Sequence, residues 1–205
     1  MYENSKLSII CPVCGNIANM FEHTHYVCTK CNWDSLVNTV DISYGDNLSS
    51  PLSNLFPHNF TIYNSISPNT CIYCLSMESF LQSLRVSDAK LQKYICENYS
   101  GYASYKLRLS LNDWRKDGIV YWQGKPINRF SDDYKLLITE AYNALYEGND
   151  VFRELVLPRF KDCHLIHSFG GQIQAETLLT QDEYLWQLKR LIKRYEDSHP
   201  QKEEG

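Results

Sequence analysis

The sequence lacks any apolar run approaching the roughly 20 residues that a bilayer-spanning helix needs. Its N-terminus also lacks the basic and then apolar layout of a secretory signal peptide. Nothing in the sequence therefore directs the chain out of the cytosol. We expect a cytoplasmic protein that does not insert into membranes.

A net positive charge is missing as well. The formal net charge of -4 at pH 7 gives no overall electrostatic case for binding nucleic acid or a membrane surface, although a local basic patch would be hidden in that sum. With 205 residues, of which 43% are hydrophobic, the chain can form one globular domain with a real core and a small appendage.

Cysteine, by contrast, is plentiful. Six of the eight cysteines form three C-x-x-C pairs, at Cys11/Cys14, Cys28/Cys31 and Cys71/Cys74. In a chain without a secretion signal this spacing favours metal binding over disulfides. The first two pairs are followed by Gly15 and Asn32, which tolerate positive φ, and 13 residues separate the pairs, enough for a short hairpin.

The first two pairs predict a structural zinc site. Four thiolates complete the tetrahedral shell of Zn²⁺ and leave no open position for a catalytic water. Residues 1–40 thus resemble a zinc ribbon of β type. His23 and His25 could replace one cysteine, but we favour exposed loop histidines. Lys6 and Lys30 are the module's two cations, so weak binding to phosphates is expected and a docking or stabilising role is favoured.

The rest of the chain reads as a mainly helical α+β domain over residues 42–197, followed by a flexible tail over 198–205. A polar segment from 43 to 51 suggests a linker, and residues 60–63 suggest a strand. Helices are expected after Met77, Asp88, Ser131 and Asp150. The clearest helix begins at Thr180, which forms a capping box with Glu183.

The segment PLSNLFPHNF (51–60), a short strand, and the helical segment SMESFLQSLR (76–85) follow one another at a characteristic separation. Together they resemble the NADAR family, the YbiA-like N-glycosidases that act on ADP-ribose-type and related ribosylamine substrates. The resemblance covers roughly residues 42–195. It implies a NADAR-like fold and a pocket for a nucleotide-like ligand.

The resemblance also implies roles for individual residues. Glu78 matches the catalytic glutamate of the family, Gln82 the glutamine one turn later, and Asn54 a loop residue that shapes the pocket. Arg85 stands where the family usually has lysine, and an arginine can hold an anion but cannot form a Schiff base. Near the C-terminus, where an acidic residue is usual, this chain has His167, which is expected to act as an acid at the leaving group. Gly170 is expected to contact the substrate.

Several further side chains are expected near the substrate. Phe56 offers an aromatic ring in the loop, and Arg129 and Trp122 lie in an extended segment over 117–131. For Trp122, burial in the core and stacking on a ligand are equally supported. The third cysteine pair could hold a second metal with Cys96 or Cys163, but we favour free thiols.

The expected function is hydrolysis of an N-glycosidic bond to ribose, for example removal of ADP-ribose from guanine bases in nucleic acid. Such a reaction passes through an oxocarbenium-like transition state, for which a nearby carboxylate is suited. Arg85 would hold a phosphate and lower the pKa of Glu78, so that the carboxylate is ionised at neutral pH. The alternative is a non-catalytic adaptor that binds ADP-ribose or a nucleotide. A third interpretation is a solvated helix face with a weak ion pair.

Overall fold

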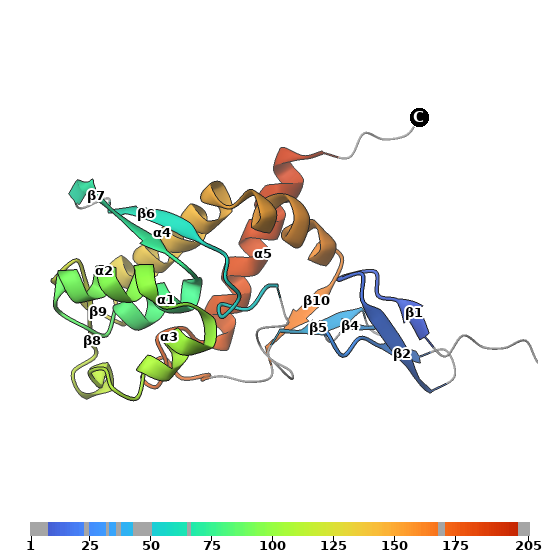
Figure 1. The fold of residues 1–205 in the computed structure, drawn as a ribbon, viewed down its shortest axis with the longest axis horizontal. Helices are drawn as coiled ribbons and strands as arrows, with labels where there is room; N and C mark the ends of the chain where they lie inside the picture. The colour runs from blue at the N-terminus through green and yellow to red at the C-terminus, as the bar shows by residue number, and fades with distance from the viewer. Residues whose placement is uncertain are drawn as a thin grey trace, which may run out of the picture.

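The computed structural model describes residues 8–22, 25–31, 33–35, 38–42, 51–64, 67–167 and 171–200. These ranges form a mixed α/β fold in which a six-stranded sheet adjoins a body of helices (Figure 1). The sheet contains β1 (Ser8–Ile10), β2 (Ile17–Glu22), β3 (His25–Val27), β4 (Trp33–Asp34), β5 (Thr39–Asp41) and β10 (His164–Ile166).

Two hairpins and the helices make up the remainder. The hairpins pair β6 (Phe60–Asn64) with β7 (Ser67–Cys74) and β8 (Ile119–Trp122) with β9 (Lys125–Asn128). The α-helices are α1 (Met77–Ser83), α2 (Ala89–Asn98), α3 (Gly101–Leu107), α4 (Asp132–Gly148) and α5 (Gln181–Ser198). Short helical turns form η2 (Trp114–Lys116), the π-helix η3 (Val151–Val156) and the 3-10 helix η4 (Leu157–Phe160). None of the helices in these described ranges is long and apolar enough to cross a bilayer.

The large sheet joins the two ends of the chain. Its order is β1-β2-β3-β4-β5-β10, and β10 lies parallel to β5, with Leu165 opposite Val40. Both of these side chains are buried. The cysteine-rich module therefore shares a sheet and core contacts with the C-terminal half, and the sheet runs across the boundary expected near residues 40–42. The segment expected to be a linker falls largely at 43–50, outside the described residues.

Helix α1 is buried along its whole length. Ser76 and Ser79 form a reciprocal capping box at its start, and all seven of its residues are buried. On one side, Phe80 contacts the rings of Phe60 and Trp122 at centroid distances of 6.4 and 5.2 Å. A solvated helix face is therefore the wrong interpretation of this segment.

The expected helix starts at Asp88, Ser131 and Thr180 are confirmed as N-caps. In α2, however, Leu91 is exposed and Gln92 is buried. The Gln92 amide compensates for its burial by donating hydrogen bonds to backbone carbonyl groups, including that of Tyr121 at 2.6 Å. The hydrophobic pattern alone could not reveal a buried glutamine that is fully paired.

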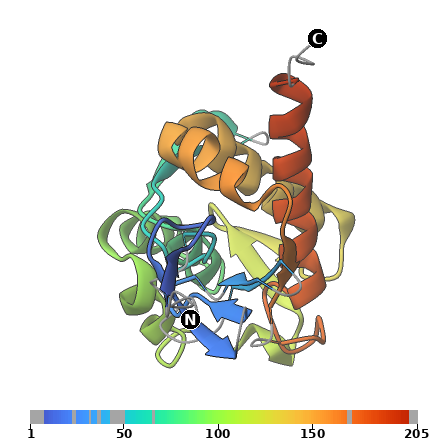
Figure 2. The ribbon, with the colours of Figure 1, turned by 90° about the vertical axis from the view of Figure 1, so that its right-hand side faces the viewer.

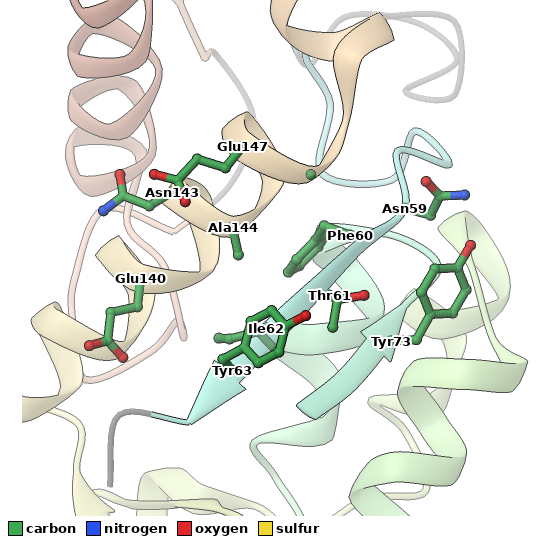
Figure 3. Close-up of a pocket in the computed structure, with 11 residues that line it drawn as sticks. Asn59, Phe60, Thr61, Ile62, Tyr63, Tyr73, Glu140, Asn143, Ala144 and Glu147 are labelled. Carbon is green, nitrogen blue, oxygen red and sulfur yellow. The ribbon is translucent and has the colours of Figure 1, made fainter. Parts of the chain in front are cut away.

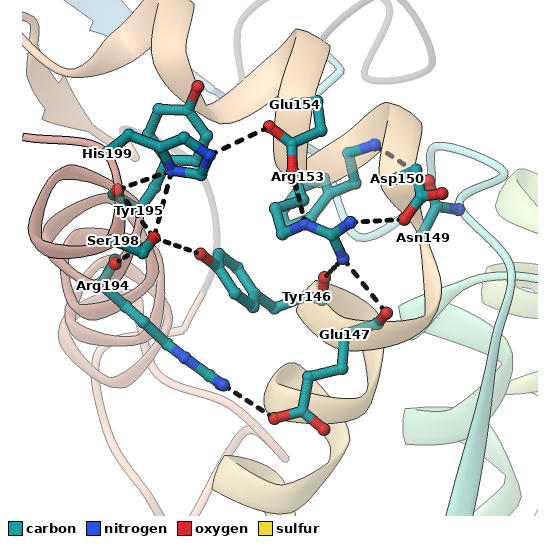
Figure 4. Close-up of polar contacts among 11 residues, drawn as sticks. Tyr146, Glu147, Asn149, Asp150, Arg153, Glu154, Arg194, Tyr195, Ser198 and His199 are labelled. Carbon is teal, nitrogen blue, oxygen red and sulfur yellow. Dashed lines mark hydrogen bonds and ion pairs between the residues drawn. The ribbon is translucent and has the colours of Figure 1, made fainter.

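Helices α4 and α5 lie side by side (Figure 2). Polar pairs connect them along their length. The pairs are Gln187 with Thr139, Arg190 with Asn143, and Arg194 with Glu147. Beyond α4, the guanidinium of Arg153 in the π-helix η3 contacts Asp150 and Glu154, and Glu154 lies 3.7 Å from His199 at the end of α5 (Figure 4). These contacts tie η3 to the last turn of α5.

Candidate functional site

Four cysteines converge at one end of the large sheet. The sulfur atoms of Cys11, Cys14, Cys28 and Cys31 all lie within 4.8 Å of one another. Two of the separations are 3.6 Å, between Cys11 and Cys31, and 3.5 Å, between Cys14 and Cys28. A tetrahedron with Zn–S bonds of about 2.3 Å has S···S edges of about 3.8 Å. The four thiols are thus placed to hold one metal ion.

Backbone turns position these thiols. Gly15 adopts φ +73°, and its amide donates to the Cys11 carbonyl, so the chain curls around the first pair. Burial raises the pKa of the Cys11 thiol to about 11 and also raises the pKa of Cys31. Binding of a cation would therefore displace protons from these buried thiols. His23 lies outside the described residues, as does the side chain of His25.

The third cysteine pair is arranged differently. Cys71 and Cys74 lie on β7, three residues apart, so their side chains point to opposite faces of the strand. Cys71 is exposed, whereas Cys74 is fully buried. The two sulfurs therefore cannot bind one ion without rearrangement of the strand.

A second constellation lies along α1 and the turn that follows it. The Glu78 carboxylate accepts a hydrogen bond from the Gln82 amide at 2.9 Å, and the Gln82 oxygen accepts one from Arg85 at 3.3 Å. Arg85 lies beyond the end of α1 and also donates to the Asn112 carbonyl. The exposed fractions of the three residues are only 9%, 7% and 6%. The three side chains thus form one hydrogen-bonded row, and this row is largely enclosed.

The electrostatics of this row differ from the expectation. Burial raises the pKa of Glu78, and the hydrogen bond from Gln82 and the charges of Arg108 and Arg85 oppose that rise only in part. The expectation that Arg85 leaves Glu78 with a lowered pKa is therefore wrong, because removal from water outweighs the nearby cations. Arg108, whose guanidinium lies 4.0 Å from the Tyr105 ring centroid, was not anticipated from the sequence.

Asn54 lies next to the row formed by Glu78, Gln82 and Arg85. Its carbonyl accepts the backbone amide of Glu78 at 2.9 Å, and its side-chain oxygen accepts the Tyr142 hydroxyl at 2.7 Å. Tyr142 lies 6.4 Å from Tyr184, whose ring is in turn 5.0 Å from His167. The structure thus brings Asn54, Glu78 and His167 into one region through two buried tyrosines. Neither tyrosine was predicted to be a site residue, because the hydrophobic pattern of its helix predicts only an ordinary core position.

Burial lowers the pKa of His167, and the charge of Asp41 opposes this effect. A histidine with a lowered pKa is neutral at physiological pH and accepts a proton more readily than it donates one. The expected acid role for His167 is therefore not supported by its surroundings. Gly170 lies outside the described residues.

One of the expected ligand contacts lies in the core, and another lines a cavity beside Asn54 that is too small for a base. Trp122 is 2% exposed and packs edge-on against Phe80, which places it in the core. Phe56 is half-buried and tilts against His58 at a centroid distance of 4.5 Å. The cavity beside Phe56 has a volume of only about 10 Å³, about the space of one water. Neither ring is therefore placed to stack on a bound base.

Arg129 is a structural residue in this fold. It is fully buried, and its guanidinium makes two hydrogen bonds to the Glu183 carboxylate, of 3.1 and 2.6 Å, and one to the Thr177 carbonyl. Glu183 also closes the capping box of α5. The pair thereby connects the β8–β9 hairpin to α5, and the fully buried guanidinium is not accessible to a substrate phosphate.

We expect Arg129→Met to lower the free energy of unfolding by about 3 kcal/mol, because it leaves the Glu183 carboxylate partly buried without its cation. Urea denaturation measures this change. The double variant Arg129→Met/Glu183→Gln should recover part of the loss, since it removes the unpaired charge. An unchanged unfolding midpoint in Arg129→Met would contradict the structural role.

Comparison with known proteins gives the family context of the site. The family model described as Bacteriophage protein GP30.3 matches residues 46–193. The chain is also 32% identical over 110 residues to an uncharacterized 17.1 kDa protein in the Gp30-rIII intergenic region of Enterobacteria phage T4, covering 53% of this chain and 71% of the phage T4 protein. No solved structure matches the chain.

The expected membership in the NADAR family is therefore wrong, because the family that matches residues 46–193 is a different one. The two motifs behind that expectation, LSNLFP and MESFLQSLR, have local structural roles in this fold. The first provides the loop whose Asn54 carbonyl accepts the Glu78 amide, and the second forms a capped, buried helix.

Proposed function

We propose that this protein, which belongs to the bacteriophage GP30.3 family, is a hydrolase that cleaves the N-glycosidic bond between ribose and a base in a nucleotide-like substrate. The main observation behind the proposal is the hydrogen bonding of the Glu78 carboxylate. In the described part of the chain its carboxylate has Gln82 as its one hydrogen-bond donor, although a carboxylate can accept about four such bonds. A largely buried carboxylate with a single donor and a pKa that burial raises is a candidate for proton-transfer chemistry.

The raised pKa of Glu78 suits a general acid. In its protonated form the carboxyl group donates its proton to the departing base as the bond to the anomeric carbon breaks. The resulting carboxylate stabilises the positive charge on the ribose ring. Water then adds to the anomeric carbon and returns its proton to the carboxylate. The balance is one water consumed, with a free base and a ribose hydroxyl formed.

The cations beside Glu78 support a phosphate-bearing substrate. Burial and the positive charges of Arg115 and Arg108 lower the pKa of Arg85, and the charge of Asp113, which pairs with Arg115 at 3.2 Å, opposes this shift. Arg85 and Arg108 therefore add positive charge near Glu78, and arginine pairs with phosphate oxygens through two parallel hydrogen bonds.

A tyrosine-rich surface on α2 and α3 supports a substrate within nucleic acid. Residues 89–116 carry six lysines and arginines against two acidic residues, although the whole chain has a net charge of -4. Tyr102 and Tyr105 stack at 5.8 Å, and Lys106 lies 4.8 Å from the Tyr102 ring centroid. Aromatic rings interleaved with cations suit single-stranded nucleic acid. Such a strand, carrying a modified guanine, is the substrate that we would test first.

We also propose that the ion held by the four cysteines is Zn²⁺ in a structural role. Four thiolates in a tetrahedral arrangement are the donor set that zinc prefers in closed sites. The four cysteines lie in the two turns that join β1 to β2 and β3 to β4, within the sheet that β10 completes. The ion therefore stabilises the sheet and takes no part in bond cleavage.

The proposed reaction is tested by incubating the protein with an oligonucleotide that carries ADP-ribosylated guanosine and with free ribonucleotides. Free base or free ADP-ribose is measured by chromatography. We expect release by the natural sequence and none by Glu78→Gln. Binding of the oligonucleotide without release by either protein would support the adaptor role instead. If neither protein binds or cleaves any of these substrates, both the hydrolase role and the adaptor role are ruled out.

A further inference from the structure

Two buried tyrosine hydroxyls, from different helices, hold the loop that precedes β6. Tyr142 on α4 donates to the side-chain oxygen of Asn54 at 2.7 Å, and Tyr184 on α5 donates to the Leu52 carbonyl. Both tyrosines are almost fully buried. A buried hydroxyl without a hydrogen bond is costly, so each of these hydroxyls stays with its acceptor in the loop.

The same loop contacts the helix that carries Glu78. The backbone carbonyl of Asn54 accepts the Glu78 amide at 2.9 Å. Asn54 therefore binds Tyr142 through its side chain and Glu78 through its backbone. Burial raises the pKa of both Tyr142 and Tyr184, and the charge of Glu78 adds to this effect in each of them. Both hydroxyls thus lie within the field of the Glu78 carboxylate.

Neither hydroxyl donates to that carboxylate, because both are bonded to neutral oxygens of the loop. In the part of the chain that the structure describes, Gln82 is the one donor to Glu78. A hydrogen bond to the charged form of a carboxyl group favours that form. A tyrosine hydroxyl that turned to Glu78 would therefore promote loss of its proton.

Little free space surrounds the Tyr142 side chain. The cavity that Asn54 and Tyr142 line has a volume of only about 10 Å³. A larger cavity, of about 740 Å³, lies between β6 and α4 and is lined by neither residue (Figure 3). A Tyr142 hydroxyl deprived of Asn54 would thus find little water, and Glu78 is the carboxylate whose charge reaches it.

We propose that Asn54 is a positioning residue that holds the Tyr142 hydroxyl away from the Glu78 carboxylate and thereby favours the protonated form of Glu78. The inference rests on the proposed function, in which protonated Glu78 is the general acid. Arg85, after α1, and Arg108, after α3, are the charged groups that act on Glu78, and both favour its ionised form. Asn54 works against these two cations.

Asn54→Leu tests the proposal, because it removes the side-chain oxygen and keeps the backbone carbonyl that accepts the Glu78 amide. The freed Tyr142 hydroxyl should turn to Glu78. We expect the pH midpoint at which Glu78 titrates to fall by about one unit, the usual effect of one added hydrogen bond to a carboxylate. Carbon-13 NMR of protein labelled at the glutamate carboxyl carbons measures this midpoint, and the Glu78 resonance is the one missing from Glu78→Gln.

Further variants separate positioning from a general loss of structure. Asn54→Leu/Tyr142→Phe lacks the freed hydroxyl, so its midpoint should return to that of the natural protein. Asn54→Ala, with a smaller side chain, should give the same fall as Asn54→Leu. Tyr134→Phe is the matched control, because it removes another buried hydroxyl of α4, which donates to the Leu178 carbonyl, and it should leave the midpoint unchanged. An unchanged or raised midpoint in both Asn54 variants, or a fall that the double variant keeps, would overturn the proposal.

The titration needs no substrate, so its outcome is distinct from that of the proposed reaction. If the Glu78 midpoint falls as expected but the natural protein releases no base, the effect of Asn54 on the Glu78 proton stands and the hydrolase proposal fails. If base is released but the midpoint does not move, the role of Asn54 alone is wrong. Where both hold, the alkaline limb of the pH–rate profile of Asn54→Leu should move to lower pH together with the midpoint.

Discussion

Replacing Cys31 by serine is expected to release the bound metal and unfold the sheet formed by β1 to β5. Cys31 is fully buried, and its sulfur lies 3.6 Å from that of Cys11. A hydroxyl is a much poorer ligand for a soft, closed site than a thiolate. Structural zinc in small modules contributes about 10–16 kcal/mol of apparent binding free energy, so no other change to this chain has a larger expected effect on its stability.

The consequence should reach the C-terminal half, because β10 pairs with β5. We expect the metal content measured by mass spectrometry to fall from about one ion per chain to almost none. Hydrogen exchange should increase over both residues 8–42 and residues 164–166. Cys71→Ser changes an exposed thiol outside the cluster and should retain the metal. A Cys31→Ser protein that keeps its metal and its exchange protection would rule out this role for the four cysteines.

The features that could be predicted from the sequence depend on local chemistry. The spacing of Cys11, Cys14, Cys28 and Cys31 requires only two tight turns, and Gly15 provides the positive φ for one of them. The cap at Thr180 likewise follows from a hydroxyl and a glutamate three residues apart. At the Thr180 cap the interacting groups are close in sequence. For the cysteines, the recurring spacing within each pair indicates that they bind together.

The features that could not be predicted depend on distant contacts. β10 has only three residues, and nothing in the segment His164–Ile166 indicates a parallel partner more than a hundred residues earlier. The burial of Glu78 and Gln82 is hidden for the same reason, since a polar stripe on an isolated helix suggests solvent. Arg129 was taken for a ligand contact because its partner, Glu183, lies on a helix far along the chain.

The candidate site combines both kinds of feature. The Glu78–Gln82 contact follows from helical spacing, whereas Arg85 joins the row from the turn after α1. Tyr142, Tyr184 and Arg108, which lie around the row, come from other elements. Burial of the row determines whether the pKa of Glu78 is raised or lowered, and burial depends on the whole fold. The sequence could therefore indicate which residues meet but could not indicate which protonation state they favour.

Glu78→Gln is expected to have opposite effects on activity and on stability. If Glu78 transfers protons in the proposed reaction, its loss should lower the rate about 100-fold to 10,000-fold, the usual contribution of a positioned acid or base. The same change should raise the free energy of unfolding at pH 8, because glutamine has the shape of the carboxyl group but carries no charge that burial would penalise.

The pH dependence follows from the raised pKa. The folded state binds the Glu78 proton more tightly than the unfolded chain, where the pKa is about 4.3. The natural protein is thus most stable, as far as this group is concerned, below the unfolded pKa, and it loses that stability as the pH rises through the folded pKa. The Glu78→Gln protein does not lose this stability. Its free energy of unfolding relative to that of the natural protein should therefore grow with pH until the folded carboxyl group is fully ionised.

Thermal melts between pH 5.5 and 8.5, a range chosen to keep the thiolates bound to metal, measure this advantage. A gain of about 1 kcal/mol would raise the melting temperature by about 2–4 °C in a chain of this size. Glu176→Gln, at an exposed glutamate, should melt like the natural protein throughout. If Glu78→Gln is instead less stable than the natural protein at every pH, the carboxylate is a structural partner of Gln82 and Arg85. The proposed catalytic role of Glu78 would then be wrong.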